Sequence, residues 1–184
     1  MDLGGILLAR HGQTDDNIPP IRAQGFTDTP LNATGRAQAA ELAERVAADG
    51  VASLWASDLS RARETAEIVG ARIGLTPALD PRLREANRGR WEGSRFIDIE
   101  RDEPELYAAW MRGGAQFRFP GGESLLDQQR RVSDALAEIH RKAPLPALVV
   151  CHGGSIRVML CARDVRGLDA FHVFEIPNVA VIAL

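Results

Sequence analysis

Two histidines stand in matching positions along this chain, each between a run of mostly aliphatic residues and a glycine. His11 follows ILLAR and precedes Gly12, and His152 follows ALVVC and precedes Gly153. If both runs are neighbouring strands of a parallel sheet, their carboxyl ends lie side by side and bring the imidazoles together. A glycine after each histidine lets a ligand approach the backbone, and a helix beginning near Gly154 would present free N–H groups to an anion. The pattern predicts an anion-binding reaction centre at the edge of a sheet.

Arginines near these histidines indicate that the centre binds phosphate rather than a metal ion. Arg10 directly precedes His11, and Arg61 lies in the segment SDLSRAR after the next expected strand. Zinc sites need three or four ligands, whereas guanidinium groups do not ligate metals and bind phosphate through a planar pair of donors. Neighbouring positive charge also disfavours the imidazolium form, which leaves a nitrogen lone pair free to attack phosphorus. We therefore expect phosphoryl transfer by a nucleophilic histidine, with no metal ion and no cofactor.

The order of apolar runs and amphipathic segments predicts the fold that holds these residues. We expect strands over 3–9, 51–56, 76–79, 147–151, 171–174 and 179–184, and helices over 32–50, 58–73, 124–142 and 154–162. Continuous apolar strands that alternate with helices indicate an α/β fold, a three-layer α/β/α arrangement around a mostly parallel central sheet. Residues 1–184 are expected to form a single domain, in which residues 85–122 are a partly irregular insertion near the active site.

The composition limits the partners and the location to be expected. A net charge of −3 gives no electrostatic reason to expect nucleic acid or an anionic membrane as a partner. No apolar run approaches the roughly 20 residues of a membrane span, and no basic stretch leads into a long apolar segment at the N-terminus. We therefore expect a cytoplasmic protein whose partner is a small molecule. Cys151 and Cys161 fit neither a disulfide framework nor a zinc site, and Cys151 is expected to be a small buried hydrophobic residue.

Further motifs resemble those of a known family. The segment LLARHGQT, with Asn17 following, resembles the signature of the histidine phosphatase superfamily, which includes cofactor-dependent phosphoglycerate mutases and fructose-2,6-bisphosphatases. RAQGFTDTPLNATG (22–35) resembles the family's substrate loop, and SDLSRARETA (57–66) resembles its second arginine motif. LREANRGRWEG (83–93) resembles the acid motif, FPGGES (119–124) a later loop, and VVCHGGSIR (149–157) the second histidine motif. The resemblance covers almost the whole chain and implies a phosphoglycerate mutase-like fold of the small phosphatase branch.

The resemblance implies a role for each matching residue. His11 corresponds to the nucleophile that takes the phosphoryl group, and Glu85 corresponds to the acid that protonates the leaving oxygen. The phosphate pocket is implied to consist of Arg10, Arg61 and His152. Substrate contacts are expected from Asn17, Arg22, Gln24, Gly25 and Gly153. A bound phosphate would raise the pKa of a nearby carboxyl group by like charge, as a general acid requires, and Glu92 in the same motif is the alternative acid.

Three functions are compatible with these residues. A phosphatase would pass the phosphoryl group from His11 to water, whereas a phosphoglycerate mutase would return it to a retained phosphoglycerate. The mutases of the family carry longer insertions, so the short middle segment ending in FRFPGGES favours hydrolysis of a phosphomonoester. A catalytically silent protein that binds phosphorylated ligands would have lost some of the site residues, and none is lost here. Small sugar phosphates, phosphoglycerate-type acids and a ribazole phosphate stay open as substrates, as do a monomer and a homodimer.

The middle segment is rich in aromatic residues and arginines whose roles the sequence leaves open. The aromatic residues are Trp91, Phe96, Tyr107, Trp110, Phe117 and Phe119, and the arginines, with one from the earlier loop, are Arg22, Arg88, Arg90, Arg95, Arg112 and Arg118. The aromatic residues either cover the pocket or pack the insertion, and the arginines either contact further anionic groups or are solvated. His140 and His172 are expected to have no catalytic role, and Asp28 and Asn178 are expected to fix loops.

Overall fold

The computed structural model describes residues 3–184, and at its centre lies a five-stranded sheet. The strands are β1 (Ile6–Arg10), β2 (Ser53–Ala56), β3 (Ala78–Leu79), β4 (Ala147–Cys151) and β5 (Val181–Ala183). Their order across the sheet is β3-β2-β4-β1-β5, and every neighbouring pair is parallel except β1 with β5. The mostly parallel α/β sheet predicted from the sequence is confirmed.

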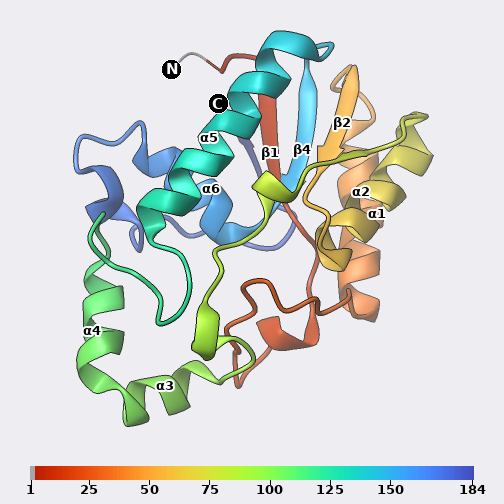
Figure 1. The fold of residues 1–184 in the computed structure, drawn as a ribbon. Helices are drawn as coiled ribbons and strands as arrows, with labels where there is room; N and C mark the ends of the chain where they lie inside the picture. The colour runs from red at the N-terminus through yellow and green to blue at the C-terminus, as the bar shows by residue number, and fades with distance from the viewer. Residues whose placement is uncertain (1–2) are drawn as a thin grey trace.

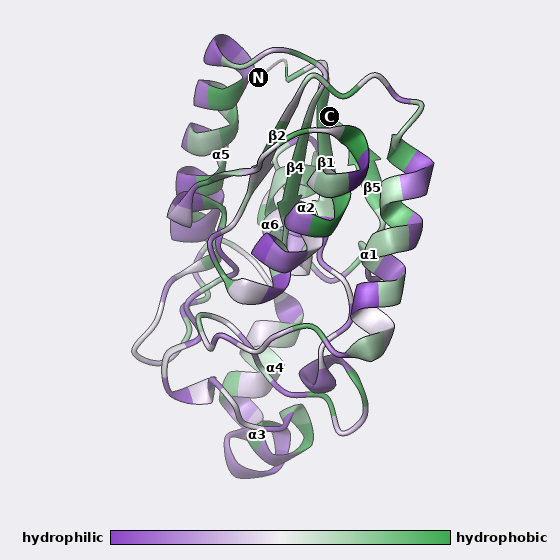
Figure 2. Cartoon of the chain, turned by 90° about the vertical axis from the view of Figure 1, so that its right-hand side faces the viewer, coloured by the Kyte–Doolittle hydropathy of each residue, from purple (hydrophilic) through white to green (hydrophobic). Residues whose placement is uncertain are grey.

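Helices cover both faces of this sheet, which makes three layers (Figure 1). α5 (Leu125–Lys142) and α6 (Gly153–Cys161) pack on one face, and α1 (Ala33–Val46) and α2 (Ser60–Ile73) pack on the other. Alternate residues of β4 serve the two faces: Val149 packs in the cluster with α5 and α6, while Leu148 and Val150 pack with α1 and α2. Figure 2 shows the strands as a green layer between helices that carry purple hydrophilic residues. Burial on both faces explains why the strand ALVVC is apolar throughout.

Local signals set the ends of the helices. The Asn32 side chain accepts a hydrogen bond from Gly35 N at the start of α1, and Ser124 forms a capping box with Asp127 at the start of α5. Gly74 ends α2 in the left-handed region, with φ +75°. The four predicted helices are confirmed with shifted ends, since α1 stops at Val46 rather than near residue 50 and α2 begins at Ser60.

Residues 85–122 lie beyond the carboxyl end of the strands, where both views place α3 and α4 (Figures 1 and 2). They contain α3 (Phe96–Asp102), α4 (Pro104–Arg112) and the 3₁₀ helix η3 (Gly89–Trp91). The remaining 3₁₀ helices are η1 (Asp15–Asn17), η2 (Pro81–Leu83) and η4 (Gly167–Ala170). Trp91, Trp110, Phe117 and Phe119 are buried together in a separate apolar cluster. Most of the aromatic residues of the middle segment therefore pack together in this apolar cluster.

The prediction of a strand over residues 171–174 is wrong. These residues form a turn after η4 and have no strand partner, because β5 occupies the sheet edge beside β1. Phe171 is buried in the aromatic cluster, and its ring lies 5.0 Å from that of His172, which in turn lies 4.9 Å from Trp110. The apolar residues of this segment thus serve packing against α4 rather than a sheet.

Candidate active site

The register of the two central strands brings the histidines together. β1 pairs with β4 so that Arg10 lies opposite Cys151, and the next residue of each strand is a histidine. His11 N donates to Cys151 O at 3.0 Å, which continues the ladder by one bond. The ring centroids of His11 and His152 are 5.2 Å apart. The sequence argument from neighbouring strand ends therefore describes this geometry correctly.

His11 has the protonation state of a nucleophile. Its Nδ1 lies 2.7 Å from the Gly12 carbonyl oxygen, and because a carbonyl only accepts, Nδ1 carries the proton and Nε2 keeps a lone pair. Burial lowers the pKa of His11 well below its usual range, and His152, Arg61 and Arg10 lower it further. The imidazole is therefore neutral near pH 7.

Buried donors without partners surround this imidazole. Arg61 is fully buried, and its two terminal nitrogens are held by Thr27 O and Gly25 O, each at 2.8 Å. Arg10 Nη1 donates to Ile176 O at 2.6 Å. Within the described residues, Arg10 Nε, Arg61 Nε and His152 Nδ1 are buried and have no hydrogen-bond partner. Buried donors of this kind are destabilising unless an acceptor reaches them. Arg10 and Arg61 line one cavity with His11, which fits an oxyanion such as phosphate, whereas His152 lies behind His11 and is not among the lining residues.

Ser57 fixes the orientation of His152. The hydroxyl Oγ of Ser57 accepts from Leu59 N at 3.4 Å and lies 2.8 Å from His152 Nε2. When the Ser57 hydroxyl donates its hydrogen to Nε2, the imidazole proton is on Nδ1, the nitrogen that has no partner among the described residues. Burial lowers the pKa of His152 well below its usual range, followed by the charge of Arg61. His152 is therefore a neutral imidazole, oriented by Ser57.

Glu85 is buried against the start of α6. Its carboxylate accepts from Gly154 N and Gln128 Nε2, at 2.8 and 2.9 Å, and from Ala86 N at 2.9 Å. Burial raises the pKa of Glu85, but Arg88 and these hydrogen bonds outweigh burial and lower it to about 2. The carboxyl group is thus ionised in the free protein and needs a proton before it can act as an acid.

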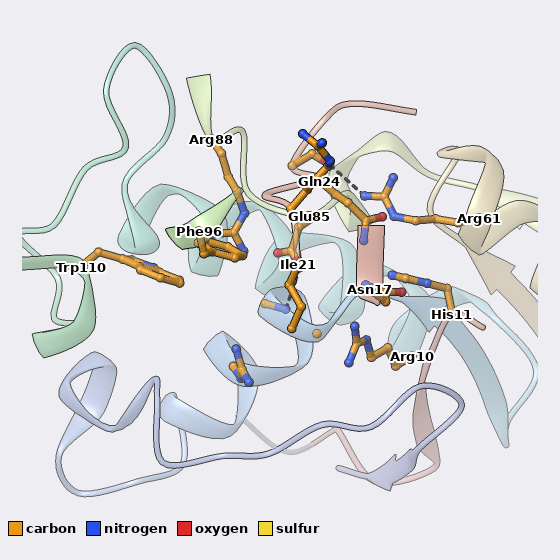
Figure 3. A pocket seen from close by; sticks show the side chains of 15 residues that line it. Arg10, His11, Asn17, Ile21, Gln24, Arg61, Glu85, Arg88, Phe96 and Trp110 are labelled. Carbon is orange, nitrogen blue, oxygen red and sulfur yellow. Dashed lines mark hydrogen bonds between the residues drawn. The ribbon is translucent and has the colours of Figure 1, made fainter. Parts of the chain in front are cut away.

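All the predicted substrate contacts line one cavity of about 180 Å³. Figure 3 shows His11, Arg10, Arg61 and Asn17 at one side of it, with Gln24 and Glu85 in the middle. The cavity is also lined by Arg22, Gly25 and Gly153. Asn178 donates to His11 O at 3.0 Å and to Asn17 Oδ1 at 3.3 Å, and Asp28 accepts from Ser60 N at 2.6 Å. Asn178 and Asp28 therefore fix loops, as expected.

Glu92, the alternative acid, is occupied elsewhere. One of its carboxylate oxygens accepts from Phe26 N at 2.8 Å and from Arg88 N at 3.0 Å, and the other accepts from the Thr27 hydroxyl at 3.0 Å. Glu92 is absent from the residues that line the cavity. It ties the loop containing residues 24–27 to η3.

Of the two glycines that directly follow the histidines, Gly153 has room beside it for a ligand, as expected, and Gly12 does not. A Cβ on Gly12 would lie 2.3 Å from Gly35 O, and a Cβ on Gly154 would lie 2.0 Å from Glu85 Oε1. Both glycines therefore make room for other parts of the protein. Gly153 would meet its nearest neighbour, Arg10, only at 3.5 Å, so it is the glycine of this group beside which a ligand has room.

Several residues of the site escape sequence reasoning. Thr65 Oγ1 accepts from Gly12 N at 3.1 Å and donates to Arg61 O at 2.7 Å, which links the two arginine motifs. The sequence offers one signal for Thr65, which is its position about one helical turn after Arg61 in α2. Gln128 on α5 carries no comparable signal, because its contact with Glu85 depends on how α5 packs. Arg157 also lines the cavity.

Residues 3–184 contain neither a candidate metal-binding cluster nor a candidate membrane-spanning helix. No group of three or more His, Cys, Asp or Glu residues in this range is placed to hold a metal ion. No helix in the same range is long and apolar enough to cross a membrane. Cys151 is buried, and burial raises the pKa of its thiol to about 12, which agrees with the expected role as a small hydrophobic residue.

A parallel α/β sheet with paired histidines and an arginine-lined anion pocket at its carboxyl edge defines a phosphoryl-transfer enzyme. Residues 6–184 match the family described as histidine phosphatase superfamily (branch 1), and the chain belongs to this superfamily. Its enzyme class is phosphomonoesterase, as the sequence predicts.

Similar proteins carry both phosphatase and mutase names. Glucosyl-3-phosphoglycerate phosphatase of Mycobacterium tuberculosis is 37% identical over 166 residues, which cover 85% of this chain and 74% of that protein. A probable phosphoglycerate mutase GpmB of Escherichia fergusonii is 37% identical over 167 residues, 90% of this chain and 76% of that protein. The solved structure of mycobacterial glucosyl-3-phosphoglycerate phosphatase with VO3 has a TM-score of 0.87 and 32% identity, and the match covers 96% of this chain and 88% of that one.

Proposed function

We propose that the protein hydrolyses small phosphomonoesters through a phosphohistidine on His11, without a metal ion. The observation that carries this proposal is the neutral His11 in one cavity with Arg10 and Arg61, whose Nε donors are unpaired, and with the His152 ring 5.2 Å from its own. These donors would hold the phosphoryl oxygens and stabilise the charge that they carry during transfer. Glu85, on the same cavity, supplies the acid.

The reaction has two steps. In the first, the Nε2 lone pair of His11 forms a bond to phosphorus, the P–O ester bond breaks, and the leaving oxygen takes a proton from Glu85. In the second, a water molecule attacks phosphorus and gives its proton to Glu85. The P–N bond breaks, which releases inorganic phosphate and restores neutral His11.

A mutase reaction is the second candidate, because several of the relatives bear a mutase name. The two candidates share the first step and differ in what accepts the phosphoryl group. Product analysis separates them: a phosphatase given 3-phosphoglycerate releases inorganic phosphate, whereas a mutase forms 2-phosphoglycerate faster than phosphate.

The test of the proposal is replacement of the nucleophile. His11→Ala should reduce kcat/KM on a panel of phosphomonoesters, assayed without added metal, by about 10³-fold or more. Brief mixing with substrate should give the wild-type protein an acid-labile, base-stable phosphoryl adduct that the variant lacks. His140→Ala, in the last turn of α5, is the matched control and should keep wild-type rates. Hydrolysis that survives in the His11 variant, or that requires a divalent ion, would refute the proposal.

A further inference from the structure

A second cationic group lies across the cavity from the phosphate-binding residues. Figure 3 shows Arg88, Phe96 and Trp110 on the side away from His11, Arg10 and Arg61. Arg88 is only 9% exposed, and its Nε and Nη1 are buried with no hydrogen-bond partner among the described residues. The cavity therefore holds unpaired guanidinium donors at both ends.

Aromatic rings hold the Arg88 guanidinium in place. The guanidinium carbon lies 5.6 Å from the centroids of Phe96 and Trp110 and 5.0 Å from that of Phe119. Cation–π contacts of this kind orient a cation, but they do not neutralise it or satisfy its N–H groups. A buried guanidinium without an acceptor is unfavourable, and burial accordingly lowers the pKa of Arg88.

We propose that Arg88 binds a second anionic group, carried by the alcohol part of the substrate. The substrate is then a phosphomonoester whose leaving group bears an anion such as a carboxylate. This inference rests on the function proposed above. In Figure 3 Glu85 lies between the two cationic ends, and all of these residues line one cavity. A substrate with its phosphoryl group at His11 and its second anion at Arg88 would therefore extend past Glu85.

Binding at Arg88 would also affect the acid. Among the groups that lower the pKa of Glu85, Arg88 comes first. A substrate anion on Arg88 offsets that positive charge, and the bound phosphoryl group adds negative charge beside Glu85. Both effects favour the protonated carboxyl group in the complex, so that recognition of the second anion and supply of the proton are coupled.

A purely internal role for Arg88 as the counter-charge of Glu85 makes a different prediction. The hydrogen bonds to Glu85 come from Gly154, Ala86 and Gln128, and none comes from Arg88. If Arg88 acted only through Glu85, its removal would shift the pH profile for every substrate equally. If Arg88 binds the leaving group, its removal changes the preference between substrates.

The test compares two esters that differ in one charge, 3-phosphoglycerate and glycerol 3-phosphate. The wild-type protein should prefer 3-phosphoglycerate, and Arg88→Met should reduce the ratio of the two kcat/KM values by roughly 10- to 100-fold. Arg88→Lys should keep part of the preference. The matched control is Arg112→Met, an exposed arginine at the end of α4, which should leave the ratio unchanged.

The outcomes separate this inference from the function on which it rests. Equal use of both esters by the wild-type protein, or an unchanged ratio in Arg88→Met, would overturn the role of Arg88 while the phosphatase proposal stands. If the wild-type protein hydrolyses no phosphomonoester, these two included, the phosphatase proposal itself is overturned.

A binding measurement covers the case in which the Arg88 variant does not fold. Inhibition of the wild-type protein by 3-phosphonopropionate should be at least tenfold stronger than inhibition by propylphosphonate, which lacks the carboxylate. A series of longer phosphonocarboxylates would then find the separation that best spans His11 and Arg88. Equal inhibition across the series would contradict a second anion site.

Discussion

Glu85 is ionised in the free protein, and this determines where the proton for the leaving group comes from. With a pKa lowered to about 2, the carboxyl group carries almost no proton near pH 7. A phosphomonoester has a second pKa near 6, so its monoanion can bring the missing proton into the site. The productive complex then contains one proton shared between the substrate and Glu85.

This proton balance predicts the pH dependence of kcat/KM for an alkyl phosphate. We expect a plateau between about pH 5 and 6 and a fall of about tenfold per pH unit above it, as the substrate loses its proton. His11 adds no acid limb near pH 6.5, because burial and nearby cations keep its pKa well below that value. Initial rates between pH 5 and 8 provide the measurement, and a rise in kcat/KM from pH 5 to 7 would contradict it.

The role of Glu85 also predicts a dependence on the leaving group. Glu85→Gln should lower kcat/KM for an alkyl phosphate by about 10²- to 10⁴-fold, the usual range for losing a general acid. With 4-nitrophenyl phosphate the loss should be about tenfold or less, because nitrophenolate leaves without protonation. Equal losses on both substrates would show that Glu85 positions groups rather than donating a proton.

At the scale of elements, one carboxylate connects the substrate loop to the phosphate pocket. Glu92 binds Phe26 N and the Thr27 hydroxyl, and the carbonyls of Gly25 and Thr27 hold Arg61. The loop is therefore held from both sides, and the position of the Arg61 guanidinium depends on it. Glu92 is in this sense a positioning residue for Arg61.

Variants of Glu92 should change phosphate binding more than the chemical step. Glu92→Ala should raise the KM for substrate and the Ki for inorganic phosphate by roughly tenfold, because several hydrogen bonds to the loop are lost. Glu92→Gln keeps one acceptor oxygen for the backbone N–H groups and should stay within about threefold of wild type. Steady-state kinetics on alkyl and nitrophenyl esters provide the check. A large kcat loss in Glu92→Gln, confined to alkyl esters, would instead identify Glu92 as the acid.

At the scale of the whole molecule, the sequence predicts what depends on strand order and misses what depends on packing. The pairing of His11 with His152 follows from two apolar runs that end in histidine, because parallel strands share a carboxyl edge. Residues 171–174 have the same apolar character as a strand, and only the aromatic cluster around Trp110 distinguishes them. Arg88 is one of many arginines in the sequence, and its burial becomes visible only when α3 and α4 are placed over it.

The buried histidines make the stability of the whole fold depend on pH. Burial lowers the pKa of His11 and of His152 well below 6.5, and it also lowers the pKa of His172, which is half-buried against Trp110. The unfolded chain takes up protons on these groups as the pH falls through 6.5, whereas the folded protein does not. The contribution of these neutral histidines to the free energy of unfolding is therefore complete above pH 6.5. Below that pH the free energy of unfolding falls by about 1.4 kcal/mol per pH unit for each histidine that stays neutral in the folded protein.

Urea unfolding at pH 5.0, 6.0 and 7.5 measures this dependence. The free energy of unfolding should be highest at pH 7.5 and should fall with increasing steepness toward pH 5.0, a range in which Glu85 stays ionised in the folded state. His11→Asn removes one of the groups and should flatten the slope, even if it also lowers the stability at pH 7.5. Inorganic phosphate should stabilise the wild-type protein at each pH, because it binds the folded state and pairs the buried donors. A stability that is flat from pH 7.5 to 5.0 would mean that these histidines are protonated in the folded protein at the lower pH, and a slope unchanged in His11→Asn would mean this of His11 alone. Either result would overturn the neutral nucleophile.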